Sequence, residues 1–287
     1  MYVITGITGQ VGGAVGRALL AAGLPVRAVV RDDAKAAAWA AQGCDIAYAE
    51  MNDAAALTAA FRGAEAVFVL LPPNFDPAPG FPDTEERVAA LHTALLAAQP
   101  RRVVCLSTIG AQAQQPNLLN ALRIMERTLG TLPMPVAFLR AGWFMENLIW
   151  DIALARATGV VPSFLQPLDK PVPMVATADV GRMAAELLQQ DWSGVRVVEL
   201  EGPVRITPNE IAAVMSAVFN RPVAMEAVPR HTWESLFRSQ GMKHPEPRMR
   251  MLDGFNQGWI EFEGPSVCKG QVPVSAVVQA LADKAVS

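Results

Sequence analysis

Along the first half of the chain, short continuous apolar runs alternate with longer stretches of helical spacing. Runs such as 66–71 and 103–107 contain almost no polar residue, which is typical of strands buried on both faces of a parallel sheet. The Ala-rich stretches between them place apolar residues three and four positions apart, which predicts amphipathic helices. Strands that alternate with helices predict an α/β fold with a doubly wound parallel sheet.

The same pattern predicts the bounds of the individual elements. Strands are expected at 2–5, 26–30, 46–49, 66–71, 103–107, 136–139 and 195–200. Helices are expected at 9–22, 34–42, between 52 and 63, from a capping box at 83–86 to Ala98, near 117–129 and at 177–189.

The alternation ends after Asn147. Residues 151–175 contain several prolines and little regular patterning, and residues 203–287 are richer in Met, Trp, Arg and Pro. These changes predict a large unit formed by residues 1–150 plus 176–202. A smaller C-terminal α/β lobe, formed by 151–175 plus 203–287, is expected over the carboxyl ends of the strands. Within that lobe, the mixed charges and prolines of 244–250 predict a surface loop.

Three glycines at intervals of three follow the first predicted strand. Gly6, Gly9 and Gly12 stand between that strand and a helix, in Thr5-Gly6-Ile7-Thr8-Gly9-Gln10-Val11-Gly12-Gly13. Such glycines permit a tight turn, close approach of backbone N–H groups to a diphosphate, and close packing of the helix. The start of the helix adds N–H donors and partial positive charge. The motif therefore predicts a dinucleotide site, whereas Gly16, one turn further on, is expected to serve packing.

The end of the second strand bears on the choice between NAD and NADP. An NAD site offers the ribose a carboxylate about 20 residues beyond the glycines, but this strand ends in Val30 and Arg31. Valine cannot bind a ribose hydroxyl, whereas Arg31 can pair with a 2′-phosphate, assisted by Lys35. Asp32 and Asp33 would repel a phosphate if they faced it. The sequence favours NADP(H), with NAD(H) as the alternative.

Composition and charge exclude several classes of partner. The net charge of −3 provides no general attraction for nucleic acid or an anionic membrane, and no run of 18 apolar residues predicts a transmembrane helix. No signal peptide is recognisable, and the three cysteines are far apart, which fits a reducing, cytoplasmic location. Neither Cys nor His has metal-binding spacing. The oligomeric state stays open, with a homodimer as one option.

Several segments together resemble one known family. They are the glycine motif with Arg31, 61–68, 106–111, 139–147 with its Glu-Asn-Leu turn, 178–181 and 201–203. In these segments the chain resembles the NmrA-like family of atypical short-chain dehydrogenase/reductases over nearly its whole length. The resemblance implies a Rossmann domain, NADP(H) binding and a small C-terminal lobe. Some members reduce quinones or triphenylmethane dyes, and others bind the dinucleotide as redox sensors without evident turnover.

The resemblance also implies site residues, carried over position by position. Cofactor contacts are expected at Gly6, Thr8, Gly9, Gln10, Val11, Gly12, Arg31, Leu71, Pro72, Ser107, Thr108 and Ile109, and near the adenine at Glu50 and Met51. At the end of the sixth strand, Trp143, Phe144 and Asn147 are expected to contact an acceptor, with packing between the lobes as the alternative. Glu146 is expected to be a solvated or salt-bridged loop residue. Weaker candidates for the acceptor pocket, which core packing would also explain, are His231, Trp233, Phe237, Met242 and Met249.

The proton donor of the wider superfamily is missing. Its Tyr-x-x-x-Lys pair cannot be formed by Tyr2 or Tyr48, the two tyrosines present, and Leu122 stands where many relatives keep a lysine or histidine. Reduction of a simple ketone needs a positioned acid, whereas a quinone or cationic dye delocalises the incoming electrons. The sequence therefore predicts an NADPH-dependent reductase of quinone-like or other delocalised aromatic acceptors. A non-catalytic redox sensor that binds NADP(H) is the alternative.

Overall fold

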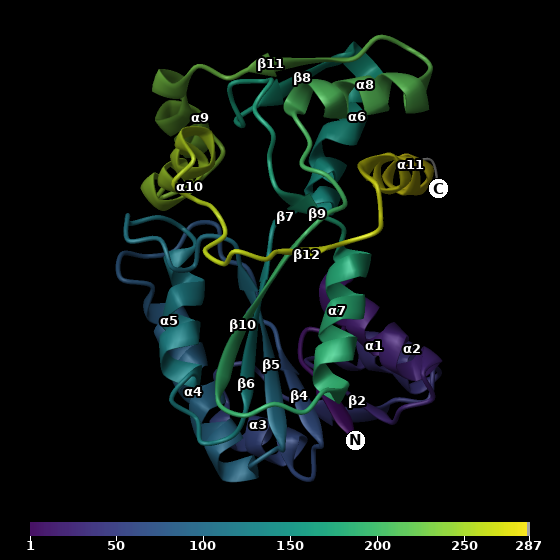
Figure 1. The fold of residues 1–287 in the computed structure, drawn as a ribbon, viewed down its shortest axis with the longest axis vertical. Helices are drawn as coiled ribbons and strands as arrows, with labels where there is room; N and C mark the ends of the chain where they lie inside the picture. The colour runs from purple at the N-terminus through teal and green to yellow at the C-terminus, as the bar shows by residue number, and fades with distance from the viewer. Residues whose placement is uncertain (286–287) are drawn as a thin grey trace.

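The computed structural model describes residues 1–285 and is built around one parallel sheet. Its eight strands follow the order β12-β10-β6-β5-β4-β1-β2-β3, in the lower half of Figure 1. Every neighbouring pair is parallel, so the carboxyl ends of the strands lie along one edge. The strands are β1 (Tyr2–Ile4), β2 (Val26–Val30), β3 (Asp45–Tyr48), β4 (Ala66–Val69), β5 (Arg102–Thr108), β6 (Val136–Ala141), β10 (Val195–Glu201) and β12 (Cys268–Lys269).

The central strands are the continuous apolar runs of the sequence. β4 is buried along its whole length, and Phe68 pairs in register with Ile4 of β1 and with Val104 of β5. Both faces of these strands are apolar because both are covered by helices. The predicted parallel arrangement is confirmed.

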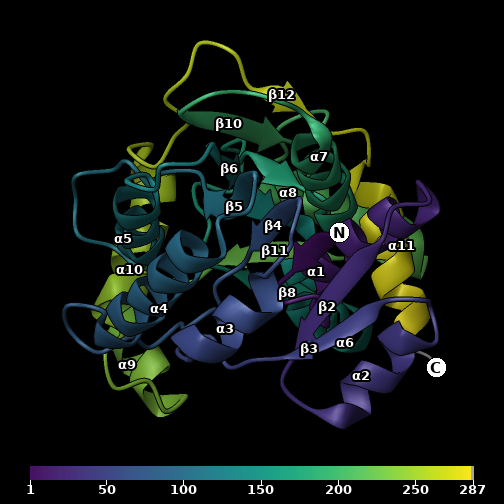
Figure 2. The ribbon, with the colours of Figure 1, turned by 90° about the horizontal axis from the view of Figure 1, so that it is seen from below.

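Helices form one layer on each face of the sheet, as Figure 2 shows for α7 on one side and α3, α4 and α5 on the other. The first layer holds α1 (Gln10–Ala21), α2 (Asp33–Ala40) and α7 (Thr177–Gln189). The second holds α3 (Ala54–Phe61), α4 (Pro82–Ala98) and α5 (Asn120–Leu129). The predicted doubly wound α/β fold is confirmed.

A smaller body lies above the carboxyl edge of the sheet (Figure 1). Its apolar core includes the fully buried side chains of Trp233 and Phe237. Two short parallel strand pairs, β8 with β11 and β7 with β9, belong to this part. Its elements are β7 (Trp143–Phe144), η1 (Met145–Leu148), α6 (Ile149–Thr158), β8 (Val160–Ser163), β9 (Met174–Val175), α8 (Pro208–Phe219), β11 (Ala224–Ala227), η2 (Arg230–Thr232), α9 (Trp233–Ser239), α10 (Glu246–Gln257) and α11 (Val274–Lys284).

Two local predictions are wrong. The helix that follows residue 81 has no capping box, because its N-cap is Phe81 in the left-handed region (φ 58°), which makes no side-chain cap. The run 244–250 is not a surface loop, since α10 begins at Glu246. Its prolines lie at the start of the helix, where a missing N–H breaks no helical hydrogen bond.

The last third of the chain also contributes to the main sheet. The two residues of β12 pair with the end of β10, so this segment crosses from the smaller body back to the sheet. Within residues 1–285, no helix is both long enough and apolar enough to span a bilayer.

Candidate functional site

The glycine turn connects β1 to α1 with very little space between its backbone segments. Gly6 has a φ of 62°, and a Cβ added to Gly12 would lie 2.2 Å from the carbonyl oxygen of Gly6. Any side chain at position 12 would therefore displace the turn. The first turn of α1 has no acidic residue, and its N-cap Gly9 offers no side-chain hydrogen bond. Its backbone N–H groups are thus left for a ligand, and the turn fits a diphosphate.

The predicted contacts of this turn differ in exposure. Thr8, Gly9 and Gln10 are exposed, whereas Val11 and Gly12 are buried. The side chain of Val11 packs in the core of the first helical layer, so this residue offers a ligand its backbone. Gly16 is a packing residue as expected, because a Cβ there would lie 2.9 Å from Ile7 Cδ1 and 3.1 Å from the Trp39 ring.

Arg31 follows β2 directly and is exposed. No carboxylate of the described chain pairs with its guanidinium. The two neighbouring aspartates are engaged locally: Asp32 accepts a hydrogen bond from the backbone N–H of Lys35 (3.1 Å), and Asp33 accepts one from the Tyr48 hydroxyl (2.6 Å). Both carboxylates thus have partners of their own, and Arg31 is left available for an anion.

Two further residues predicted to lie near the adenine follow β3. Glu50 is exposed, whereas the side chain of Met51 is buried in the core beneath α3 and α4. A ligand could therefore contact Met51 only through its backbone.

The glycine turn lies next to the exit of β4. The backbone N–H of Leu70 donates a hydrogen bond to Thr5 Oγ1 (2.9 Å), and a Cβ on Gly6 would lie 3.0 Å from Leu70 Cδ2. The next residue, Leu71, lines a large pocket. The turn and the pocket are thus neighbours along the carboxyl edge of the sheet, the expected place for a ligand in this fold.

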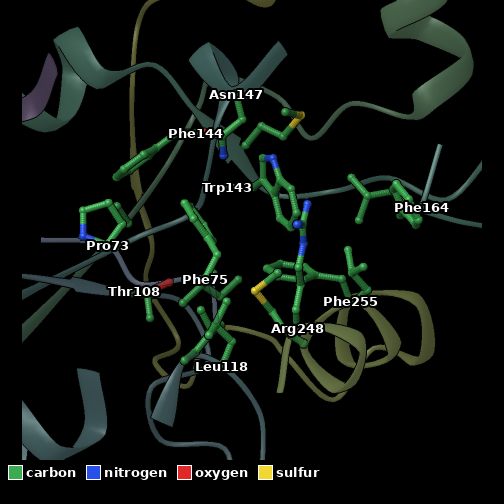
Figure 3. Close-up of a pocket in the computed structure, with 18 of the residues that line it drawn as sticks. Pro73, Phe75, Thr108, Leu118, Trp143, Phe144, Asn147, Phe164, Arg248 and Phe255 are labelled. Carbon is green, nitrogen blue, oxygen red and sulfur yellow. The ribbon is translucent and has the colours of Figure 1, made fainter. Parts of the chain in front are cut away.

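The pocket has a volume of about 760 Å³ and lies between the sheet and the smaller body (Figure 3). This volume is in the range of small-molecule and cofactor sites. Eight residues predicted from the sequence line it together: Leu71, Pro72, Ser107, Thr108, Ile109, Trp143, Phe144 and Asn147. The smaller body supplies the opposite wall, which includes Phe164, Arg248, Met251, Leu252 and Phe255.

Most of the lining is apolar and aromatic. Trp143 and Phe255 meet edge to face, with ring centroids 5.2 Å apart. Phe75 and Trp150 also line the pocket and are 59% and 83% exposed, so aromatic side chains extend out into solvent. Flat aromatic ligands suit such walls.

A buried ion-pair network supports one polar group of the lining. Ser107 Oγ donates a hydrogen bond to Glu126 (2.6 Å), and Glu126 accepts two from Arg140 (2.9 and 2.8 Å). Burial alone would lower the pKa of Arg140, but the hydrogen bonds with Glu126 and Glu263 outweigh it and raise that pKa. Arg140 therefore stays charged and fixes Glu126, which in turn orients the Ser107 hydroxyl at the pocket.

The Thr108 hydroxyl, at the end of β5, and the Asn147 amide, within η1, line the pocket without a hydrogen bond to the rest of the described chain (Figure 3). They are available to bind polar atoms of a ligand.

Asp151 and Arg248 are the two ionisable side chains among the lining residues that the structure describes. Burial raises the pKa of the Asp151 carboxyl to about 6 and lowers the pKa of the Arg248 guanidinium. No carboxylate of residues 1–285 pairs with Arg248. A nearby opposite charge would lower the pKa of Asp151 and raise that of Arg248, but the two pKa values move the other way. The pocket thus contains two unpaired ionisable groups.

Neither tyrosine of the chain reaches this pocket. Tyr2 is buried in β1 and Tyr48 is engaged with Asp33. Leu122 lines the pocket at the position where many members of the resembled family keep a lysine or histidine. The lining residues of the described chain include neither tyrosine nor lysine.

The weaker candidates of the smaller body do not line the pocket. The lining contains none of His231, Trp233, Phe237, Met242 and Met249. Trp233, Phe237 and Met249 are buried in the core of the smaller body. Arg248 lines the pocket although its sequence context, with Pro245 and Pro247, is typical of a loop. The available signal was Met249, Met251, Leu252 and Phe255, which have helical spacing.

Glu146 differs from its prediction. Its carboxylate accepts hydrogen bonds from the backbone N–H of Thr177 (2.9 and 3.0 Å) and from the Thr177 hydroxyl (2.6 Å). Glu146 is half-buried and forms no ion pair with another described residue. It binds the first residue of α7 and complements the partial positive charge of that helix.

One loop connects the two parts of the molecule beside the pocket. The Asp76 carboxylate accepts hydrogen bonds from the backbone N–H groups of Lys243 (2.8 Å) and His244 (2.6 Å). The hydrogen bond from Lys243 is the main cause that lowers the pKa of Asp76. Asn74 and Phe75, just before Asp76, line the pocket. This bond pair therefore fixes the position of one pocket wall.

The family pattern described as NmrA-like matches residues 2–257 of the sequence. This chain belongs to the NmrA-like family. It is 30% identical over 244 residues to an NAD(P)H azoreductase of Xenophilus azovorans, covering 84% of this chain and 82% of that protein. It is 27% identical over 244 residues to quinone oxidoreductase 2 of Escherichia coli, with the same coverage of 84% and 82%.

Solved structures of the same fold include an NADPH-dependent quinone oxidoreductase from Escherichia coli, complexed with NADPH. It superposes with a TM-score of 0.82 at 24% identity, covering 98% of this NmrA-like chain and 99% of that one. The likeness shows that the Rossmann-type architecture extends over the whole chain.

Proposed function

We propose that this protein binds NADP(H) and reduces a quinone-like or other delocalised aromatic acceptor. The observation that carries the proposal is the pocket itself: it adjoins the glycine turn, has aromatic walls, and its described lining contains no tyrosine or lysine. Two relatives support it, because one is named an azoreductase and the other a quinone oxidoreductase. Both azo compounds and quinones spread incoming electrons over a conjugated system.

The turn and the end of β2 would hold the nucleotide. The first N–H groups of α1 would bind the diphosphate, and Arg31 would pair with the 2′-phosphate. Asp32 and Asp33 would not oppose this, because their carboxylates bind Lys35 N–H and the Tyr48 hydroxyl. The preference for NADP(H) over NAD(H) therefore depends on Arg31.

Bound NADPH would supply a hydride at the edge of the sheet where β5 and β6 end. The chain would bring an acceptor against it by stacking on Trp143 and Phe144. The free Thr108 hydroxyl and Asn147 amide would orient the polar atoms of the acceptor. Because no Tyr-Lys pair lines the pocket, the proton would come from water after the electrons have been delocalised, which a simple ketone does not permit.

The test is loss of NADPH absorbance with the purified protein and a panel of acceptors. We expect turnover with naphthoquinones or azo and triphenylmethane dyes, and none with aliphatic ketones. Turnover of ketones with inert quinones would refute the acceptor class. Tight NADP(H) binding without turnover of any acceptor would instead support a redox sensor.

Arg31→Ala tests the choice of cofactor. The variant should lose about tenfold or more in affinity for NADPH and little for NADH, as expected for loss of a charge-assisted pair. Arg101→Ala is the control, because Arg101 is an exposed arginine just before β5, at the opposite edge of the sheet, and its loss should leave both affinities unchanged. An Arg31→Ala variant that keeps its preference for NADPH would contradict this assignment.

A further inference from the structure

Arg248 lines the pocket and has no carboxylate partner in the described chain, in contrast to two other arginines of the smaller body. Arg230 binds Asp253 through two hydrogen bonds (2.6 and 2.8 Å), and Arg205 binds Glu261 through two (2.7 and 2.8 Å). The guanidinium of Arg248 has instead the Phe237 ring, 4.6 Å from its centroid, and the Met242 sulfur at 3.8 Å. These soft partners leave its charge without a counter-ion.

The side chain of Arg248 points into the pocket. Figure 3 shows it extending from the first turn of α10 among apolar side chains, with Trp143, Phe164 and Phe255 around it. Burial among such groups removes water from the guanidinium, and an unpaired cation in these surroundings binds anions strongly. Stacking on Phe237 holds the planar group in place, so that a ligand meets its N–H groups already positioned.

The other charges of the chain do not satisfy this site. Asp151 also lines the pocket but forms no ion pair with Arg248. The phosphates of a dinucleotide would lie at the glycine turn and Arg31, none of which lines the pocket. The counter-ion of Arg248 would therefore be an anionic group of the acceptor.

We infer that Arg248 forms an anion subsite, and that the acceptor is a flat conjugated molecule carrying a carboxylate or sulfonate. This inference rests on the proposed function, because it names the acceptor class of that same pocket. The aromatic walls bind the ring system, and the guanidinium binds the acid group through a two-pronged pair of hydrogen bonds. A small inorganic anion gains nothing from those walls, so the site selects aromatic acids.

The first experiment compares two acceptors, 1,2-naphthoquinone-4-sulfonate and uncharged 1,4-naphthoquinone. For each enzyme form, the ratio of kcat/KM for the sulfonate to that for the neutral quinone is measured. Arg248→Met should lower this ratio by about tenfold or more, through KM of the sulfonate, as expected for loss of a hydrogen-bonded charge pair. Arg248→Lys should keep part of the ratio, because lysine retains the positive charge but cannot form two parallel hydrogen bonds with the acid group.

Arg250→Met is the matched control. Arg250 lies on the same helix but faces the Trp259 ring at 5.9 Å and does not line the pocket. Its ratio should equal that of the wild type. An Arg248→Met ratio that also equals the wild-type ratio, whatever the absolute rates, overturns the inference. Equal losses for both quinones would assign Arg248 to packing and overturn it too.

A binding experiment separates this inference from the proposed function. Calorimetry with naphthalene-2-sulfonate and with 2-naphthol, in the presence of NADP⁺, needs no turnover. Selective binding of the sulfonate that Arg248→Met weakens about tenfold supports the subsite even if no quinone is reduced. Normal reduction of neutral quinones, with no preference for the sulfonate in either assay, overturns the subsite and leaves the proposed function intact.

Discussion

Asp151 offers a test of how the pocket acts on a charged group. Its carboxyl lies in the first turn of α6, lines the pocket, and has a pKa raised to about 6 by burial. The perturbation is Asp151→Asn, which keeps the shape and removes the charge. We expect this variant to be more stable than the wild type above pH 7, because burial of the ionised carboxyl opposes folding.

The magnitude follows from the pKa difference. A change from 3.8 to about 6 favours the protonated form in the folded protein by about 3 kcal/mol. The start of α6 opposes this, since a helix N-terminus stabilises an anion by about 0.3–1 kcal/mol. Desolvation is the larger effect, so the variant should gain about 2 kcal/mol at pH 8. For a chain of this size that corresponds to about 4 °C in Tm.

The sign of the pH dependence is fixed by linkage. Because the folded pKa lies above the unfolded one, the stabilising contribution of the Asp151 proton is complete below about pH 4 and is lost as pH rises through about 6. The free energy of unfolding of both proteins, measured in urea from pH 4 to 8, should therefore converge at the acid end. The gap should open mainly between pH 4 and 6 and level off above that.

The exposed Asp169 provides a control for the loss of one negative charge. Asp169→Asn should follow the wild-type curve throughout. A gap for Asp151→Asn that is constant with pH, or a variant less stable than the wild type at pH 8, would refute the reasoning that burial raises this pKa.

Three further predictions concern packing and charge elsewhere. Gly181→Ala should lower the free energy of unfolding in urea by about 1–3 kcal/mol, because the new Cβ would lie 2.4 Å from that of Ala14; an unchanged midpoint would contradict the tight α1–α7 contact. Arg140→Met should cost about 3–5 kcal/mol by leaving Glu126 buried without its partner, and a neutral result in the same assay would contradict that account. Asp76→Ala should speed amide hydrogen exchange in 70–81 and 241–245 by releasing the bonds to Lys243 and His244. Since those bonds lower the Asp76 pKa, their stabilising contribution is present at neutral pH and lost as pH falls through that lowered value; exchange equal to wild type at pH 7 would argue against the connection.

Much of the main sheet and of its ligand edge was predictable because the signals are local. A buried parallel strand must be apolar on both faces, so a strand such as 66–69 can be recognised from the sequence as a continuous apolar run. The glycine turn is equally local: the close approach of Gly12 to Gly6 excludes any side chain there. The pocket residues at the ends of β5 and β6 followed from these strands, because carboxyl ends of parallel strands share one edge.

The smaller body was harder to predict because its elements depend on distant partners. The proline-containing run at 244–250 suggested a loop, although the apolar residues from Met249 onward have helical spacing. Only the packing of α10 against α9 decides that Arg248 is directed at the pocket. Trp233 and Phe237 were candidates for the pocket or for the core, and the structure places both in the core, where Arg248 lies over the Phe237 ring. Glu146 likewise has its role only because Thr177, 31 positions away, begins a helix beside it.

The sequence by itself determined the parallel sheet, the glycine turn and the absence of a Tyr-x-x-x-Lys pair, because each depends only on which residue types occupy positions close together in the chain. Tertiary structure alone decided which ionisable groups face the pocket and which have partners. The physical reason is that a charge acquires its pKa and its availability from the groups around it, and for Asp151 and Arg248 those groups come from segments that the chain brings together only by folding.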